Sequence, residues 1–175
     1  MKIINCELVD AKIIQSQYSF DSRGCFNKIF ETKIFEQLNL PNSISETFIS
    51  VSNKNVIRGM HFQNTNPQAK FVSCIFGEIY DVIVDLRPDS PTYLKWQGFY
   101  LNSYNKHVLY VPKGFAHGFQ SRCNGTIVLY NNVGEYSKED DTGFRYNDPL
   151  INIQWVKCEQ PVIMSERDKI LPFLE

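Results

Sequence analysis

Short runs of apolar residues, most of them alternating with polar ones, follow one another through the middle of the chain. The clearest lie between residues 46 and 133: ETFISVS, VIRGMHF, AKFVSCIF, EIYDVIVDL, LKWQGFYL, HVLYVP, AHGFQSR and TIVLYNNV. Turn-forming residues recur every ~8–12 positions, a spacing typical of an all-β barrel or sandwich. Gly77 and Glu78 are interpreted as the tight turn of a hairpin between two of these runs. The pattern therefore predicts an all-β fold.

The two ends of the chain are less regular. Further strands are predicted over residues 1–9, 13–20, 25–31 and 151–156. One short helix is predicted over residues 32–40, ended by Pro41. A second begins at Ser165, which can cap it, with Asp168 three positions later. Helices are thus expected only at the periphery of the β fold.

Composition limits the function. We expect one domain over residues 1–175, with 43% hydrophobic residues to build its core. A net charge of -1 and a pI near 6.3 predict neither nucleic acid nor an anionic membrane as partner. The five cysteines form no CxxC pair and are interpreted as buried free thiols in a reducing compartment. No apolar run approaches the ~18 residues of a membrane span and the N-terminus does not resemble a signal peptide, so we expect a cytoplasmic protein.

Residues 56–70, VIRGMHFQNTNPQAK, concentrate groups that can do chemistry. Arg58 beside Gly59 can bring a guanidinium against an anion, and His61 is the candidate acid or base. A lone histidine in a β-rich core is more often structural, but here Arg58 and Lys70 lie near His61 in the sequence. This stretch is therefore the first candidate for an active site.

Two other possibilities were weighed. A metal site would need clustered histidines with a carboxylate, whereas His61 is followed by Phe62 and Gln63, so we predict no metal. Tyr130 shares one strand face with Val128 and can handle a proton, although a core aromatic is the more common role at such a position. For Lys70 and Asp168, each taken alone, the most common role is that of a charged side chain on the solvated surface.

The ordered motifs resemble one known family. FDSRGCF, VIRGMHFQ, QAKFV, GEIYDVIVDLRPDSPTYLKW, YVPKGFAHGF, VLY followed by GEY, YNDPLINIQW and SERD resemble those of the dTDP-4-dehydrorhamnose 3,5-epimerases, also called RmlC-like cupins. The resemblance extends from about Asp21 to Asp168. It implies a cupin jelly-roll barrel with short peripheral helices, a homodimer that exchanges N-terminal strands, and neither metal nor organic cofactor.

The resemblance also implies catalytic roles. Such enzymes invert carbons beside the ketone of a nucleotide-linked 4-keto-6-deoxy sugar through an enolate, with a base on one face and an acid on the other. His61 resembles the base, Asp168 the carboxylate that orients it, and Tyr130 the acid. Lys70 resembles the cation that stabilises the enolate oxygen.

Binding residues follow from the same resemblance. Arg58 and Arg167 resemble the diphosphate contacts, since guanidinium groups pair well with phosphate. His117 resembles a sugar contact and Tyr136 the aromatic that stacks on the base. Arg23 and Phe26 resemble the part of the nucleotide pocket lent by the neighbouring subunit.

Three residues depart from the family pattern. Glu46 and Phe48 stand where a glutamine and an asparagine usually contact the sugar, and Phe48 cannot hydrogen-bond a hydroxyl. Lys28 stands where a glutamate usually accepts from thymine, and a lysine suits the acceptor-rich edge of guanine. The nucleotide is therefore left open between dTDP and GDP, and the sugar includes unusual ones such as a 6-deoxy-heptose.

We predict an epimerase acting at C3, C5 or both, in surface polysaccharide biosynthesis, with double epimerisation the first choice and C3-only epimerisation the second. Two other possibilities remain. A 3,4-ketoisomerase would use the same kind of enolate, and a catalytically silent cupin would only bind the sugar nucleotide.

Overall fold

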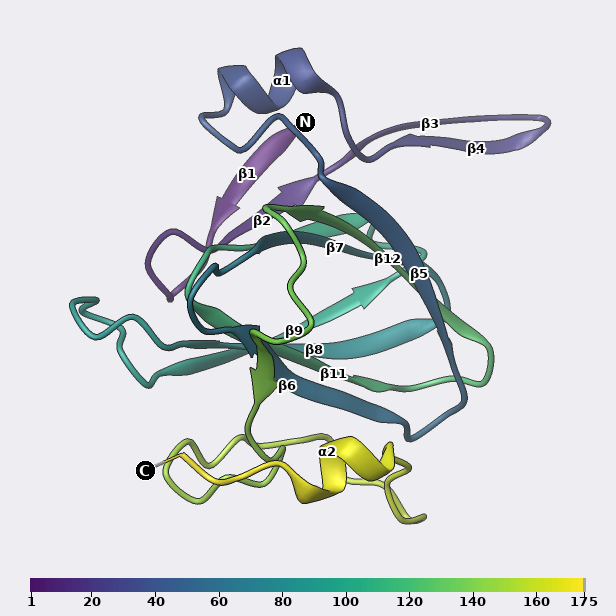
Figure 1. Cartoon of the computed structure of the whole chain (residues 1–175). Helices are drawn as coiled ribbons and strands as arrows, with labels where there is room; N and C mark the ends of the chain where they lie inside the picture. The colour runs from purple at the N-terminus through teal and green to yellow at the C-terminus, as the bar shows by residue number, and fades with distance from the viewer. Residues whose placement is uncertain (175) are drawn as a thin grey trace.

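The computed structural model describes residues 1–174, and over this range nearly all regular structure is strand (Figure 1). The strands are β1 (Lys2–Asn5), β2 (Lys12–Gln15), β3 (Gln17–Asp21), β4 (Gly24–Lys28), β5 (Glu46–Ser52), β6 (Ile57–Gln63), β7 (Ala69–Phe76), β8 (Glu78–Asp85), β9 (Trp96–Asn102), β10 (His107–Val111), β11 (Phe115–Ser121), β12 (Thr126–Val133) and β13 (Asp141–Gly143). The helices are α1 (Thr32–Gln37) and α2 (Glu166–Ile170). The predicted all-β class with short peripheral helices is confirmed.

Two antiparallel sheets face each other. The larger sheet has the order β1-β2-β10-β7-β12-β5, and the smaller one β13-β6-β11-β8-β9. The chain passes repeatedly from one sheet to the other, which is the arrangement of a jelly roll. A separate hairpin of β3 and β4 extends away from both sheets (Figure 1).

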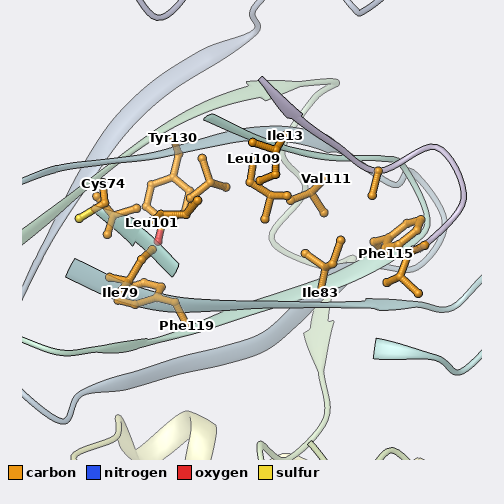
Figure 2. Close-up of a cluster of buried hydrophobic side chains, with 14 residues drawn as sticks. Ile13, Cys74, Ile79, Ile83, Leu101, Leu109, Val111, Phe115, Phe119 and Tyr130 are labelled. Carbon is orange, nitrogen blue, oxygen red and sulfur yellow. The ribbon is translucent and has the colours of Figure 1, made fainter. Parts of the chain in front are cut away.

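The main core fills the space between the sheets (Figure 2). Val72, Leu109 and Val128 point inward from the larger sheet, and Ile83 and Phe119 from the smaller one. Each of these five side chains is almost completely buried. Alternation along each strand produces this face, because successive side chains point to opposite sides of a sheet.

Two outer clusters cover the backs of the sheets. Phe35 of α1 packs with Phe71 and Val108 on the outer face of the larger sheet. The C-terminal segment covers the outer face of the smaller sheet. There Ile151 and Ile153 form one cluster with residues of the sheet such as Val82 of β8. The central strands are therefore buried on both faces, and this explains their long apolar runs.

The predicted hairpin at residues 77–78 is wrong. β7 pairs with β10 and β12 in the larger sheet, whereas β8 pairs with β11 and β9 in the smaller one. Gly77 has a φ of 79° and connects the two sheets at a corner. In the sequence, a short glycine turn between apolar runs looks the same whether it closes a hairpin or connects two sheets. Only the packing of both strand faces distinguishes these two arrangements.

Five predicted elements also differ from expectation. Residues 151–156 form no strand within the described range: Ile151 ends a turn, Asn152 has a φ of 52°, and the Trp155 indole donates to the Tyr146 carbonyl at 2.7 Å. Residues 13–20 are two strands, because Ser16 breaks the run and donates to the Lys106 carbonyl at 2.7 Å. The strand predicted over residues 1–9 covers Lys2–Asn5 only, the one predicted over residues 25–31 ends at Lys28, and α1 ends before the predicted stop.

The cysteines were predicted to be buried free thiols. All five are free, but only Cys74 is buried, and Cys25 and Cys123 are exposed. The prediction of burial is therefore wrong for most of them, since Cys25 lies on the extended β3–β4 hairpin and Cys123 in a loop.

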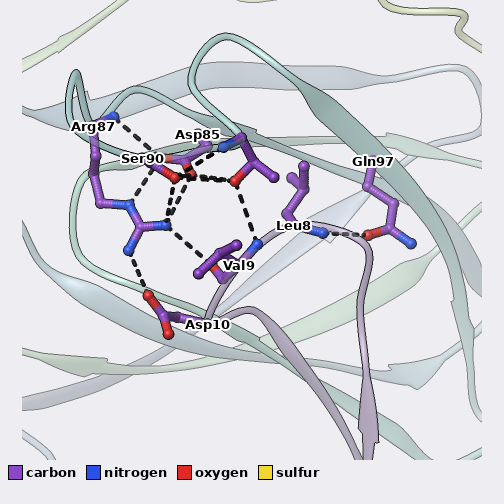
Figure 3. A network of polar contacts seen from close by, with 8 residues as sticks. Leu8, Val9, Asp10, Asp85, Arg87, Ser90 and Gln97 are labelled. Carbon is purple, nitrogen blue, oxygen red and sulfur yellow. Dashed lines mark hydrogen bonds and ion pairs between the residues drawn. The ribbon is translucent and has the colours of Figure 1, made fainter.

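A polar network fastens the N-terminal loop to the barrel (Figure 3). The Arg87 guanidinium donates to Asp85 at 2.8 Å and to Asp10 at 2.8 Å. Ser90 and Thr92 hydroxyls also donate to Asp85, at 2.5 and 2.7 Å. Burial alone would raise the pKa of Asp85, but the hydrogen bonds from Arg87 and the two hydroxyls lower it to about 2.

Asp85→Asn should therefore lower the free energy of unfolding by about 2–3 kcal/mol at pH 7, because a buried, charge-assisted hydrogen-bond network loses its acceptor. The folded-state pKa lies below the ordinary value of 3.8, so the carboxylate stabilises the fold above this pH and its contribution disappears as the pH falls toward 2. Urea unfolding at pH 7 and at pH 3 measures both effects. Asp89→Asn, in the exposed part of the same loop, is the matched control. Equal stabilities of the two variants at pH 7 would contradict this account.

Candidate active site

The site forms where β6 and β11 approach each other closely. The register shifts between the His61–His117 pair and the Arg58–Phe119 pair, so β6 carries an extra residue, a β-bulge. Gly59 has a φ of 124°, and a Cβ at this position would collide with Gly118 of β11. The bulge re-aims the side chains, so Arg58 and His61 line one cavity although they lie three positions apart.

The C-terminal segment brings a carboxylate to His61. Ile163 pairs with the start of β6, where the Ile57 amide donates to the Ile163 carbonyl at 2.9 Å. Ser165 then caps α2 by accepting from the Asp168 amide at 3.1 Å, as predicted. This turn directs the buried Asp168 side chain toward β6.

His61 and Asp168 form a hydrogen-bonded pair, with Nε2 and Oδ1 2.8 Å apart. The other carboxylate oxygen accepts from the Gly59 amide at 3.3 Å. Burial raises the pKa of Asp168, but the hydrogen bond and charge of His61, with the Gly59 amide, outweigh it and leave the pKa below its usual range. A surface position for Asp168 was the default expectation and is wrong, since its side chain is buried.

Tyr130 lies in the wall of the same cavity, which has a volume of about 540 Å³. Its ring stacks on Phe48, with centroids 4.7 Å apart and planes 17° apart. The His117 ring is nearly perpendicular to it, with planes 76° apart and ring centroids 6.1 Å apart. Burial raises the pKa of Tyr130 far above its usual range. The phenol is therefore protonated at neutral pH and can only donate a proton.

Lys70 separates this cavity from a smaller one of about 300 Å³, and its side chain lines both. Burial lowers the pKa of Lys70, against the charges of Asp141, Glu46 and Asp81, which raise it. Glu46 is held in the smaller cavity by the Asn132 amide at 2.9 Å and the Gln68 amide at 3.3 Å. The partly buried Lys70 amine thus lines the same cavity as His61 and Tyr130.

Two arginines border the larger cavity. Arg58 donates to the Ser52 hydroxyl and the Val51 carbonyl, both at 3.1 Å. Arg167 donates to the Asp141 carboxylate at 2.8 Å. Both arginines line this cavity, and guanidinium groups have a geometry suited to the oxygens of a polyanion such as a diphosphate.

Comparison with known proteins decides the family. The family model for dTDP-4-dehydrorhamnose 3,5-epimerase matches residues 5–175. The chain belongs to this family. A dTDP-4-dehydrorhamnose 3,5-epimerase of Methanothermobacter thermautotrophicus is 38% identical over 96% of this chain and 91% of its own length. A dTDP-4-dehydrorhamnose 3-epimerase of Streptomyces niveus is 35% identical, covering 86% of this chain and 74% of the relative.

The solved structures agree. The Bacillus anthracis dTDP-4-dehydrorhamnose 3,5-epimerase, crystallised with TDP and PPi, is 40% identical and covers 99% of both chains with a TM-score of 0.93. The resemblance stated from sequence, the jelly-roll fold and the assignment to the sugar epimerases are all confirmed. As a member of the dTDP-4-dehydrorhamnose 3,5-epimerase family, the chain is an isomerase.

Within this epimerase-family fold, three predicted binding residues lie apart from the cavities. Arg23, Phe26 and Lys28 belong to the extended β3–β4 hairpin. Arg23 pairs with Asp21 at 2.6 Å, Lys28 pairs with Glu31, and Phe26 is exposed. They line neither cavity of their own chain, and the role of Arg23 and Phe26 in a neighbouring subunit's nucleotide pocket stays a prediction.

Sequence reasoning missed two carboxylates in the site. Asp81 is fully buried and its two oxygens lie 3.0 and 2.9 Å from Nε2 of His117; burial raises the pKa of Asp81 despite that partner. The carboxylate of Asp141 in β13 accepts hydrogen bonds from the Arg167 guanidinium at 2.8 Å and from the Tyr136 hydroxyl at 3.4 Å. An aspartate inside the apolar run IYDVIVD was a usable signal for Asp81, because a buried charge needs a partner. Asp141 had no comparable signal.

Residues 1–174 contain no group of three or more His, Cys, Asp and Glu side chains arranged to hold a metal ion. The same range has no helix with the length and apolar character needed to span a membrane.

Proposed function

We propose that this chain epimerises a dTDP-linked 4-keto-6-deoxy sugar at C3 and C5. The observation that carries the proposal is the shared cavity of the His61–Asp168 pair, Lys70 and Tyr130. It unites a base with its orienting carboxylate, a cation and a protonated phenol. The names of the relatives support dTDP as the nucleotide.

His61 removes the proton on the carbon next to the ketone. The C–H electron pair forms a carbon–carbon double bond, and the carbonyl pair moves to oxygen, so an enolate results. Lys70 stabilises the negative oxygen, which is where charge develops in the transition state. Tyr130 then delivers its hydroxyl proton to the opposite face and recovers a proton from solvent, while His61 loses its own proton to solvent.

The nucleotide diphosphate is assigned to the cavity mouth. Arg58 and Arg167 bind the phosphates, since both carry donors suited to phosphate oxygens. Tyr136, which is exposed beside Arg167, stacks on the base. Glu46 and His117 contact the sugar. GDP and a 6-deoxy-heptose remain alternatives because of Lys28 and Phe48, and a role in polysaccharide synthesis stays a prediction.

Solvent deuterium incorporation tests the proposal. The protein is incubated in heavy water with dTDP-linked and GDP-linked 4-keto-6-deoxy sugars, and C3 and C5 are followed by NMR. Deuterium and inversion at both carbons, faster with dTDP, are expected. A ketone shifted from C4 to C3 would instead show a ketoisomerase, and binding without exchange would show a silent sugar-nucleotide-binding protein.

A C3-only epimerase is the second candidate, favoured by the similarity to the Streptomyces niveus 3-epimerase. His61 and Tyr130 serve either reaction, because the same enolate chemistry acts at each carbon. Deuterium at C3 with none at C5 after complete conversion would establish it.

We further infer a homodimer that exchanges N-terminal strands. The β3–β4 hairpin leaves Tyr18, Phe20 and Phe26 exposed, and a lone two-stranded hairpin is marginally stable in water. A second copy would cover these apolar side chains. In turn, Arg23 and Phe26 would complete the nucleotide site of that copy, and Lys28 would reach the base.

Mixed dimers should therefore recover activity from two inactive partners. Unfolding and refolding Arg23→Ala with His61→Asn should give about a quarter of wild-type activity at substrate concentrations well below KM, because half of the randomly formed dimers contain one intact site. Mixing His61→Asn with Tyr130→Phe is the control, since every site then keeps a defect. Light scattering should give twice the 20.4 kDa mass of the chain. Heterodimers without any recovery would refute the shared site.

A further inference from the structure

Phe48 occupies an unusual position for a large apolar side chain. It lies on β5, directly opposite Tyr130 of β12, and it lines both cavities of the site. Its neighbours on the same strand face are polar, Glu46 and Ser50. With 43% of its surface exposed, Phe48 adds little to the core. Its aromatic contact is the parallel stack on Tyr130.

The Tyr130 ring has two ring neighbours. Phe48 covers one face of the ring at a centroid distance of 4.7 Å, and His117 stands edge to face with it at 6.1 Å. His117 is itself fixed by both oxygens of the buried Asp81. Both neighbours of Tyr130 line the larger cavity, but only His117 is fixed by a buried carboxylate.

We propose that Phe48 is a positioning residue, which holds the Tyr130 hydroxyl on the face of the sugar opposite His61 so that the enolate is reprotonated with inversion. The inference rests on the proposed function. An aromatic stack fixes a ring plane without using the hydroxyl as a donor or an acceptor.

A positioning role for Phe48 changes which fate the enolate takes, whereas a merely structural role does not. The enolate has two fates: His61 returns a proton to the original face, or Tyr130 delivers one to the opposite face. In heavy water the first fate gives deuterium without inversion and the second gives deuterium with inversion. A displaced Tyr130 slows only the second, and a misplacement of ~1 Å can cost about 10²-fold.

The experiment measures both fates by NMR in heavy water. Phe48→Leu should raise the ratio of uninverted to inverted deuterated sugar about tenfold, with total exchange within about threefold of wild type, because the base is untouched. Phe48→Tyr, which preserves the stack, should keep the wild-type ratio. Tyr100→Leu is the matched control: a half-exposed aromatic of β9 that stands against Tyr80 outside both cavities.

A second measurement does not depend on turnover. The protein is labelled with 3-fluorotyrosine, and the ¹⁹F resonance of Tyr130 is assigned by its loss in Tyr130→Phe. Phe48→Leu should shift or broaden this resonance, and Phe48→Tyr should change it far less. An unmoved Tyr130 resonance in Phe48→Leu, or a fall of exchange and inversion in parallel, would overturn the positioning role. Absent exchange in the wild type would instead refute the proposed function, and the ¹⁹F result would still decide whether Phe48 fixes the ring.

Discussion

Replacing His61 with asparagine should lower the rate of epimerisation by about 10³–10⁴-fold and remove solvent exchange at C3 and C5 together, because one base begins the reaction at each carbon. Asparagine keeps much of the side-chain volume and can still hydrogen-bond Asp168, so the fold should survive. Rates of inversion and of deuterium uptake, measured on the same samples, test this expectation.

His107→Asn is the matched control for that experiment. His107 lies on β10, lines neither cavity of the site, and should tolerate the change with near wild-type rates. Burial lowers the pKa of His107, which favours its neutral form. Substantial deuterium uptake by His61→Asn would mean that another group is the base, and the mechanism proposed above would then be wrong.

The strands were predictable because alternation is a local property. The eight central runs become strands at nearly the expected residues, and the shared face of Val128 and Tyr130 is buried as expected. Sheet membership is not local. Gly77 separates two apolar runs that belong to different sheets. Apolar and polar residues also alternate around Ile151 and Ile153, but there the apolar side chains cover the outer face of a sheet.

The candidate site divides in the same way. His61 and Arg58 come from one strand, and their shared cavity depends on a bulge that sequence spacing alone does not reveal. Asp168 was assigned through the resemblance, and its contact with His61 depends on the C-terminal segment pairing with β6. Asp81 and Asp141 were missed since each matters through a partner distant in the sequence.

The second large effect concerns the acid. Tyr130→Phe should lower the rate of inversion by about 10²–10³-fold while leaving deuterium uptake from solvent much less affected, because His61 still forms the enolate and returns a proton to the same face. The substitution removes only the hydroxyl, so the ring can still stack on Phe48 and the core between the sheets is preserved. Burial raises the pKa of Tyr130, which keeps the phenol protonated, so the wild-type inversion rate should not fall near neutral pH through ionisation of this group.

Deuterium content and configuration at C3 and C5, followed by NMR in one time course, separate the two rates. Tyr110→Phe is the control: Tyr110 lies on β10 against Phe71 on the outer side of the larger sheet, outside both cavities. If Tyr130→Phe lost exchange and inversion equally, the phenol would be needed to form the enolate. Tyr130 would then stand beside Lys70 as a donor to the carbonyl oxygen, and another group would have to supply the proton on the far face. Comparing the loss of exchange with the loss of inversion in Tyr130→Phe therefore decides whether His61 acts as the base and Tyr130 as the acid.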